Sequence, residues 1–186
     1  SKLTITKGFS KQLKADGGKI KSCNSSNQSI ASVNNKGKIF AKKNGATTIS
    51  VQLTNGQKLL CRVKVVTNEF NKKQITLTST LYNTYAMKAY NAHFDSKGNI
   101  VVKFKIVNNN YGKIDNIDNF NINIKNAKKT TMVSYTKSNY KVTVKGYGEK
   151  ACTMTIPKSA FKVNKKQIDL RTAKFTISGD VENGSF

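Results

Sequence analysis

Histidine and acidic side chains are few in this sequence, which limits the chemistry it can perform. His93 is the only histidine and stands in a strand-like stretch among lysines, so we expect a surface residue and no triad or three-histidine metal site. The nine Asp and Glu residues fall mostly in turns, unlike the paired carboxylates of a glycosidase. Asp115 and Asp118 are the best candidates for a hard cation, but no EF-hand spacing is present and we interpret them as part of an ordinary Asn/Asp turn. We therefore predict that the protein is not an enzyme and has no cofactor or metal.

Tyrosine side chains are better candidates for a functional surface. All seven tyrosines lie after residue 68. Tyr82 and Tyr85 stand at one connection between strand-like stretches, and Tyr111 stands in a second, polar one that runs to Asn119. Exposed tyrosines stack on sugar rings or anchor protein partners. We predict that Tyr82, Tyr85 and Tyr111 bind a ligand, the alternative being packing or loop decoration.

Charge is strongly positive, with 33 Lys and Arg against nine Asp and Glu, a formal net charge of +24. Nucleic acid, anionic glycans and acidic cell-wall polymers are therefore possible partners. Only Arg62 and Arg171 are arginines, however, whereas forked recognition of phosphate or guanine favours arginine. We expect a lysine-coated surface and no specific nucleic-acid binding.

Alternation of apolar and polar residues predicts β-strands throughout. In the first part, Thr47 to Leu53 alternates without a fault, and Asn55-Gly56 is typical of a tight hairpin. The stretch from Leu59 to Val65 alternates again, so these two strands should pair antiparallel. The polar stretch from Thr67 to Lys73 interrupts the pattern and predicts a domain boundary.

The second part repeats this pattern with longer strands. Ile100 to Ile106 is the clearest of them, and Tyr90 falls in the phase of a core residue. Gly146 to Lys150 lacks the ending of a phosphate loop and is interpreted as a hairpin turn. Ser159 to Phe161 is expected to form a single helical turn.

One stretch is specific enough to suggest a family. Its elements are Ser25-Ser26-Asn27, Ile30 to Val33, a turn at Gly37, Lys38 to Lys42, and Gly45-Ala46-Thr47 opening a strand. Over residues 3–66 the sequence resembles the bacterial immunoglobulin-like domain, group 2. That resemblance implies an immunoglobulin-like sandwich, which bacteria use at their surface as a spacer, stalk unit or adhesive tip.

The cysteines leave two alternatives open. Cys61 is in phase with Leu59, Val63 and Val65, so it should point into the first core. Cys23 stands near a position where the family usually carries tryptophan, and this departure would let the two sulfurs meet. A Cys23–Cys61 disulfide and two buried thiols are both compatible with the sequence.

Taken together, these patterns predict an all-β chain of two tandem immunoglobulin-like β-sandwich domains, residues 1–67 and 68–186. We expect a non-enzymatic, monomeric fragment of an extracellular or surface protein of a Gram-positive bacterium, without a membrane span. It would space or present a binding module for a glycan, a cell-wall polymer or a host protein. The alternative is a pair of accessory domains of a secreted carbohydrate-active or cell-wall enzyme.

Overall fold

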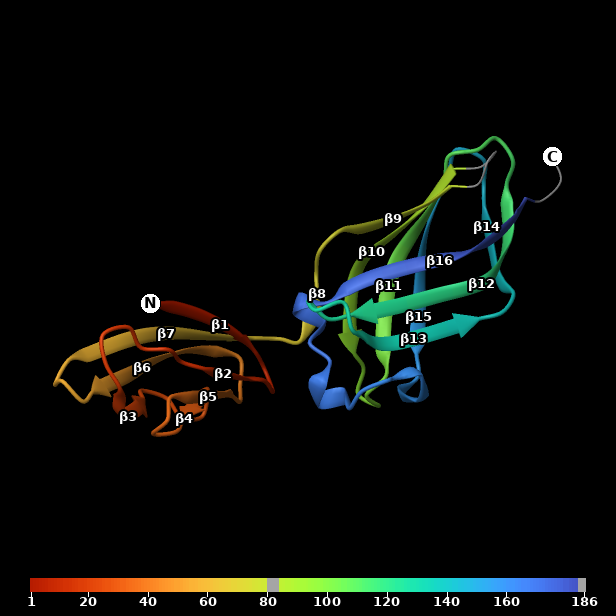
Figure 1. Ribbon diagram of the computed structural model, residues 1–186. Helices are drawn as coiled ribbons and strands as arrows, with labels where there is room; N and C mark the ends of the chain where they lie inside the picture. The colour runs from red at the N-terminus through yellow and green to blue at the C-terminus, as the bar shows by residue number, and fades with distance from the viewer. Residues whose placement is uncertain (80–83, 184–186) are drawn as a thin grey trace. The chain divides into compact units, whose positions relative to one another are not determined.

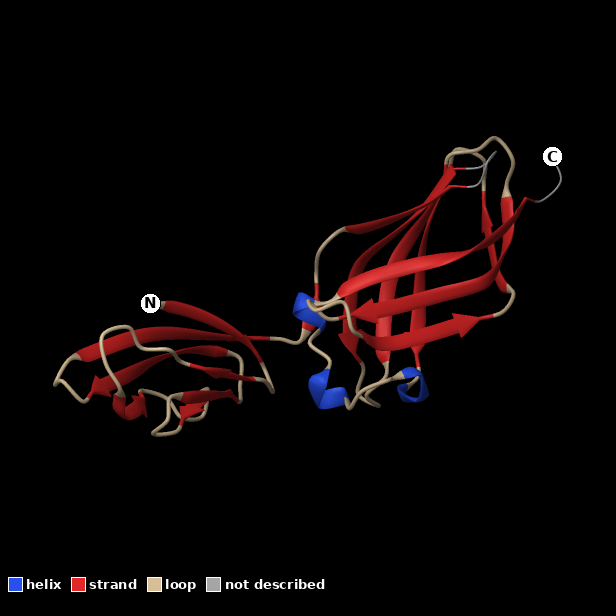
Figure 2. Ribbon diagram, viewed as in Figure 1, coloured by secondary structure: helices blue, strands red, loops and turns tan. Residues whose placement is uncertain are grey.

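A computed structural model describes residues 1–79 and 84–183 of the chain (Figure 1). By its internal contacts the chain divides into two compact units, residues 1–68 (unit 1) and residues 69–186 (unit 2). Strands dominate both units, and the only helices in the described part are three single 3-10 turns of unit 2 (Figure 2). The all-β class expected from the alternating pattern is therefore confirmed.

Unit 1 consists of two packed sheets. One has the order β1-β7-β6-β3 and the other the order β2-β5-β4, and β1 runs parallel to β7. The predicted antiparallel pairing of the last two strands, β6 with β7, is confirmed. The seven strands are β1 (Lys2–Thr6), β2 (Ser10–Gln12), β3 (Ile20–Ser25), β4 (Ala31–Val33), β5 (Lys38–Ala41), β6 (Gly45–Leu53) and β7 (Lys58–Val66).

The core of unit 1 follows from this alternation. Ile49, Val51 and Leu53 of β6 point inward and are at most 5% exposed, and they meet Ile39 and Ala41 of the facing sheet. Their neighbours Thr48, Ser50 and Gln52 are only partly covered. Burial of one face of each strand is the main stabilising term for a sandwich of this size.

Unit 2 also has two layers, which overlie one another in Figure 1. One sheet has the order β15-β11-β10-β8, with β9 also paired to β10; in the other, β12 lies between β16 and the strands β13 and β14. The strands are β8 (Glu69–Phe70), β9 (Gln74–Ser79), β10 (Thr84–Phe94), β11 (Ile100–Asn108), β12 (Ile114–Lys125), β13 (Thr131–Lys137), β14 (Tyr140–Val144), β15 (Glu149–Ile156) and β16 (Lys174–Asn183).

Two connections of unit 2 differ from the sequence-based expectation. The polar stretch up to Asn119 is not one long loop, because β12 already begins at Ile114. Register shifts on both sides of Ile117 and a positive φ of 48° at Asn119 interrupt the alternation, which hid the strand from pattern analysis. The segment around Gly146 is not a hairpin turn either, since it carries the chain from β14 in one sheet to β15 in the other.

The core of unit 2 lies between its two sheets. Phe104 of β11 stacks on Phe120 of β12 with ring centroids 5.4 Å apart, and Phe120 in turn contacts Tyr140 of β14 at 4.7 Å. Between β15 and β16 the chain forms the 3-10 turns η1 (Lys158–Ala160), η2 (Lys165–Gln167) and η3 (Leu170–Thr172). The helical turn expected near Ser159 is thus confirmed as η1.

Candidate functional site

The three tyrosines predicted to bind a ligand differ in how the structure places them. Tyr82 lies outside the described residues. Tyr85 is only 1% exposed in β10, and its hydroxyl donates to the carbonyl oxygen of Gly179 at 3.2 Å. The prediction for Tyr85 is therefore wrong, because it shares the inward phase of Met87 and Ala89 rather than standing in a loop. Of the two described residues, Tyr111 is the one at the surface.

Tyr111 is not alone. It is 75% exposed and lies beside Tyr147, which is 74% exposed, with ring centroids 6.5 Å apart and planes at 74°. This edge-to-face arrangement is a favourable one for aromatic rings. Tyr111 belongs to residues 109–113 and Tyr147 to residues 145–148, two crossings between the sheets that we call the tyrosine loops. The sequence analysis missed Tyr147 as a partner, although its position between Gly146 and Gly148 marks an exposed turn.

The buried side chain of Asn108 holds the two tyrosine loops together by hydrogen bonds to their backbones. Its side chain is 1% exposed, and its amide nitrogen donates to the carbonyl oxygens of Gly112 at 2.7 Å and Lys145 at 3.2 Å. Its amide oxygen accepts from the backbone N–H of Asn110 at 3.0 Å. A buried amide with several partners constrains both loops, because breaking any of these bonds would leave a polar group unpaired.

The backbones of the tyrosine loops also contact each other directly. Tyr147 N–H donates to the carbonyl oxygen of Asn110 at 2.9 Å, and Asn108 N–H donates to that of Gly148 at 2.9 Å. Gly146 passes so close to the facing loop that a Cβ there would lie 1.8 Å from the carbonyl oxygen of Tyr111. Only glycine fits this crossing, so the approach of the two loops is built into the sequence.

Tyr147 itself adopts an unusual backbone conformation, with a φ of 52°. Non-glycine residues rarely occupy this left-handed region, and they do so where the surrounding structure holds them. Here the cross-loop hydrogen bonds provide that restraint. The two rings are therefore presented on preorganised loops, so that little conformational entropy remains to be lost on binding.

Acidic residues near this end of unit 2 are engaged with their neighbours. Asp115 forms an ion pair with Lys113 at 3.0 Å, and Asp118 accepts from the side-chain amide of Asn116 at 3.0 Å. Within residues 1–79 and 84–183, no group of three or more His, Cys, Asp and Glu side chains is arranged to hold a metal ion. The nearby chemistry of the tyrosine loops is therefore that of ring faces, backbone amides and lysines.

His93 lies on β10 opposite Glu69 of β8 and forms no ion pair within the described residues. Its Nδ1 is 3.1 Å from the side-chain oxygen of Asn91, whose amide nitrogen donates to Glu69. The ring is partly covered rather than fully exposed. This chain of contacts ties β10 to β8 at the sheet edge, which is a structural role.

All three cysteines, each within the described part of the chain, are free thiols. The disulfide alternative for Cys23 and Cys61 is therefore not realised. β6 lies between β3, which carries Cys23, and β7, which carries Cys61. Two strand spacings separate the cysteines by about 10 Å, well beyond the Cα separation that a disulfide bridges. Burial raises the pKa of Cys23, as expected for a thiol packed against apolar side chains.

Comparisons with known proteins do not add a family to this picture. The chain matches no model of a known protein family and no curated protein. None of the helices in residues 1–79 and 84–183 is long and apolar enough to cross a membrane.

Proposed function

We propose that this chain is a non-enzymatic binding module of a bacterial cell surface, in which the tyrosine loops of unit 2 bind a glycan. The observation that supports this most directly is the pair of exposed rings, Tyr111 and Tyr147, on loops that Asn108 and Gly146 hold in place. Exposed, rigid tyrosines give large contact area at low entropic cost, and sugar rings stack on such faces. Loops on a rigid sandwich are also where binding residues concentrate.

Strand order in unit 1 supports an immunoglobulin-like assignment. The neighbours β2-β5-β4 correspond to strands B-E-D of that fold, and β3-β6-β7 correspond to C-F-G. The first strand differs from the constant-type pattern because it pairs with β7 in the second of these sheets. This arrangement favours the resemblance to the group 2 bacterial immunoglobulin-like domain.

Unit 2 supports the same proposal through its crossings. β11 pairs with β15 although β12, β13 and β14 of the other sheet lie between them along the chain. β12 pairs with β16 although the chain crosses to β15 of the other sheet between them. These correspond to the B–E and C–F pairs of an immunoglobulin-like sandwich. In this proposal unit 1 acts as a spacer and unit 2 as the reader, on a Gram-positive surface. The alternative, accessory domains of a secreted enzyme that acts on carbohydrate, would use the same tyrosine loops.

The proposal is tested by replacing both rings. The full chain and its Tyr111→Ala/Tyr147→Ala variant are applied to immobilised polysaccharides, including peptidoglycan and plant and host glycans, and to extracellular-matrix proteins. At 150 mM salt we expect the natural chain to bind at least one polysaccharide. The double variant should bind it at least about tenfold more weakly, because each stacked aromatic ring contributes on the order of 1 kcal/mol or more.

A matched control comes from unit 1, where Phe40 and Leu60 are exposed apolar residues. The Phe40→Ala/Leu60→Ala variant loses similar apolar surface and should bind normally. Equal losses in the two double variants would contradict a site at the tyrosine loops. Binding only to matrix proteins would replace the glycan by a protein ligand.

A further inference from the structure

A groove on the outer face of the first sheet of unit 2 is lined by lysines, a tyrosine and a glutamate. It has a volume of about 520 Å³ and is lined by Lys73, Lys88, Tyr90, Lys105 and Glu149, which we call the lysine groove. Volumes of this order accommodate a small ligand or one unit of a polymer. Glu149 directly follows Gly148, so the groove begins where one of the tyrosine loops ends.

A β-bulge places Tyr90 in this groove. The register between β10 and β11 shifts between Ala89 and Asn91, which leaves Tyr90 as the extra residue. Simple alternation put Tyr90 in the core, and that prediction is wrong because the bulge turns its side chain to the outer face. Bulges commonly re-aim a side chain next to binding sites. The ring is therefore available to a ligand that enters the groove.

Two lysines face each other across β10 and β11 beside Tyr90, and their repulsion destabilises the sheet. Lys88 of β10 lies directly opposite Lys105 of β11. Both project outward, since their neighbours Met87 and Phe104 are fully buried. Like charges that face each other across two strands destabilise a sheet. A nearby acid or an anionic ligand would offset this destabilisation.

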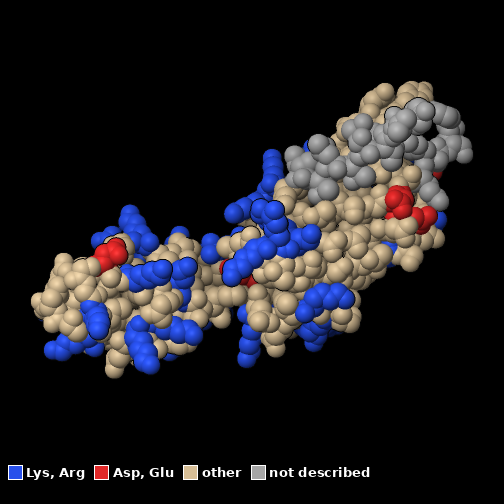
Figure 3. Space-filling view, in the orientation of Figure 1, with Lys and Arg blue, Asp and Glu red and all other residues tan. Residues whose placement is uncertain are grey.

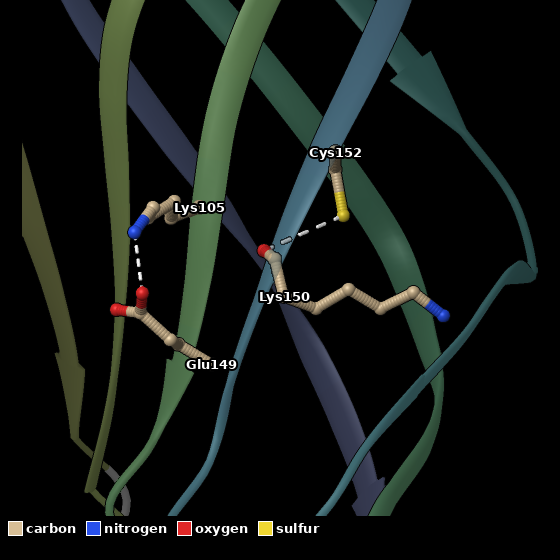
Figure 4. Close-up of polar contacts among 4 residues, drawn as sticks. All are labelled: Lys105, Glu149, Lys150 and Cys152. Carbon is tan, nitrogen blue, oxygen red and sulfur yellow. Dashed lines mark hydrogen bonds and ion pairs between the residues drawn. The ribbon is translucent and has the colours of Figure 1, made fainter.

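Glu149 contacts only one of these lysines directly. It forms an ion pair with Lys105, and Figure 4 shows the two side chains reaching toward each other while the Cys152 sulfur points away from them. The hydrogen bond to Glu149 raises the pKa of Lys105, and the same bond lowers the pKa of Glu149, with a smaller contribution from Lys88. Two positive charges remain in excess in the groove, on Lys73 and Lys88. Neither takes part in an ion pair within the described part of the chain.

This charge pattern is local and differs from the general lysine coat. Figure 3 shows lysine and arginine side chains scattered over the visible faces of both units, with few acidic ones among them. In the lysine groove, by contrast, an aromatic ring, two uncompensated ammonium groups and one carboxylate line the same small volume. The ring offers a stacking face, the ammonium groups attract an anion, and the carboxylate accepts hydrogen bonds from hydroxyls.

We infer that the lysine groove binds an anionic sugar unit of a polysaccharide, with Tyr90 against the ring and Lys73 and Lys88 at its carboxylate or phosphate. A nucleic acid fits less well, because Glu149 would repel a continuous phosphate backbone and no arginine lines the groove. The inference rests on the proposed function in that unit 2 binds a glycan. It adds that the glycan is acidic and that it passes from the tyrosine loops along the outer face of β11 and β15.

The test uses the full chain and a pair of probes that share one sugar backbone and differ in charge, oligogalacturonate and its methyl ester. A phosphomannan, built on a different sugar, offers phosphate in place of carboxylate. Binding is measured by calorimetry at 150 mM salt, where charges farther apart than about 8 Å are largely screened. We expect oligogalacturonate or the phosphomannan to bind at least tenfold more tightly than the methyl ester.

Three variants locate the binding. Lys88→Gln should weaken binding of the anionic probe about tenfold, and Tyr90→Ala should weaken it to a similar degree. Lys103→Gln is the matched control, because Lys103 lies on the same outward face of β11 but does not line the groove. It removes the same charge from the same sheet and should leave binding unchanged.

Each contrary outcome has a distinct meaning. Equal losses in Lys88→Gln and Lys103→Gln, or equally tight binding of a DNA oligonucleotide, would overturn the inference, since general charge attraction would explain the data. Binding of an anionic glycan that depends on Tyr111 and Tyr147 but not on Lys88 and Tyr90 would also overturn it, and would leave the proposed function standing. Dependence on the groove residues alone would support the lysine groove as the anion site, and it would overturn both the path from the tyrosine loops and the proposed role of those loops.

Discussion

Both units use a buried polar group to hold a connection in place, but they use it for different purposes. In unit 1, Thr47 Oγ1 accepts from the backbone N–H of Asn27 at 3.0 Å and lies 3.0 Å from Ser26 Oγ. Ser25 Oγ donates to the carbonyl oxygen of Ala31 at 2.6 Å. In unit 2, the side-chain amide of Asn108 holds the tyrosine loops in the same way, by donating hydrogen bonds to backbone carbonyl oxygens of both loops.

The difference lies in what each connection presents. The connection of unit 1 between β3 and β4 carries serine, asparagine and glutamine and no aromatic ring, so its hydroxyl network serves the fold. The tyrosine loops carry two rings that are about three-quarters exposed. Similar local physics therefore yields a structural joint in one unit and, in the other, a pair of exposed rings that we propose as a binding surface. The motif Ser25-Ser26-Asn27, which suggested the family, marks a structural element and not a ligand site.

The largest effect should come from replacing Gly146. A Cβ on this residue would lie 1.8 Å from the carbonyl oxygen of Tyr111, so Gly146→Ala must separate the tyrosine loops. We expect the free energy of unfolding of unit 2 to fall by about 3 kcal/mol or more, because backbone must move. Intrinsic tyrosine fluorescence during urea unfolding reports this directly, since the chain has no tryptophan and all seven tyrosines lie in unit 2.

Gly112→Ala is the matched control in the facing loop. A Cβ at Gly112 would meet no atom within 4 Å. The free energy of unfolding of unit 2 should therefore change by less than about 1 kcal/mol in this variant. Equal unfolding midpoints for the two alanine variants would contradict the close crossing of the loops and with it the contrast between the units.

Substitutions of Asn108 and Thr47 compare the buried polar side chains that hold a connection in each unit. Asn108→Ala should lower the stability of unit 2 by about 2 kcal/mol and also weaken ligand binding, because it releases both tyrosine loops. Thr47→Val keeps the side-chain volume but removes the hydroxyl. It should lower the stability of unit 1 by about 1–2 kcal/mol and leave binding unchanged.

Hydrogen exchange followed by mass spectrometry separates these effects, because peptides from residues 1–68 and 69–183 report on each unit. Faster exchange should be confined to the unit that carries the substitution. A loss of ligand binding in Thr47→Val as large as in Asn108→Ala would show that unit 1 also contributes to ligand binding.

The smallest effect concerns pH and the buried Tyr85. Burial raises the pKa of its hydroxyl above the ordinary value, so folding favours the protonated phenol. Its contribution to stability is complete below about pH 10, where the unfolded residue is still protonated. It is lost as pH rises further, because the unfolded state then releases a proton that the folded state retains. Unit 1 contains no tyrosine and therefore has no contribution from a buried phenol.

Tyr85→Phe tests this sign. The variant loses the hydrogen bond to Gly179 and with it about 1 kcal/mol at neutral pH. Above pH 10 its stability should fall less steeply than that of the natural chain, as followed by circular dichroism in urea. Burial raises the pKa of Tyr140 too, so a residual slope is expected. Identical slopes would mean that Tyr85 ionises as easily in the folded chain as in the unfolded one.

Local alternation by itself determined the all-β class and many of the strands. The strand from Thr47 to Leu53 and its hairpin partner follow from a period of two residues and an Asn-Gly turn, both of which depend only on neighbours in sequence. Tyr111 was also recognisable as exposed, because it stands among Asn and Gly residues at the end of a strand. The same reasoning failed for Tyr85, where a tyrosine after a connection already belonged to the next strand.

Tertiary structure alone decided which residues meet. Tyr111 and Tyr147 are 36 positions apart in the sequence, and only the side-by-side crossings between the sheets bring their rings together. Tyr90 changed faces because of a bulge, and a bulge depends on how two strands pair and not on the pattern of either strand. Cys23 and Cys61 stayed apart because β6 runs between them. Strand order, register and bulges arise from packing between distant segments, and for that physical reason the binding surface could not be derived from the sequence alone.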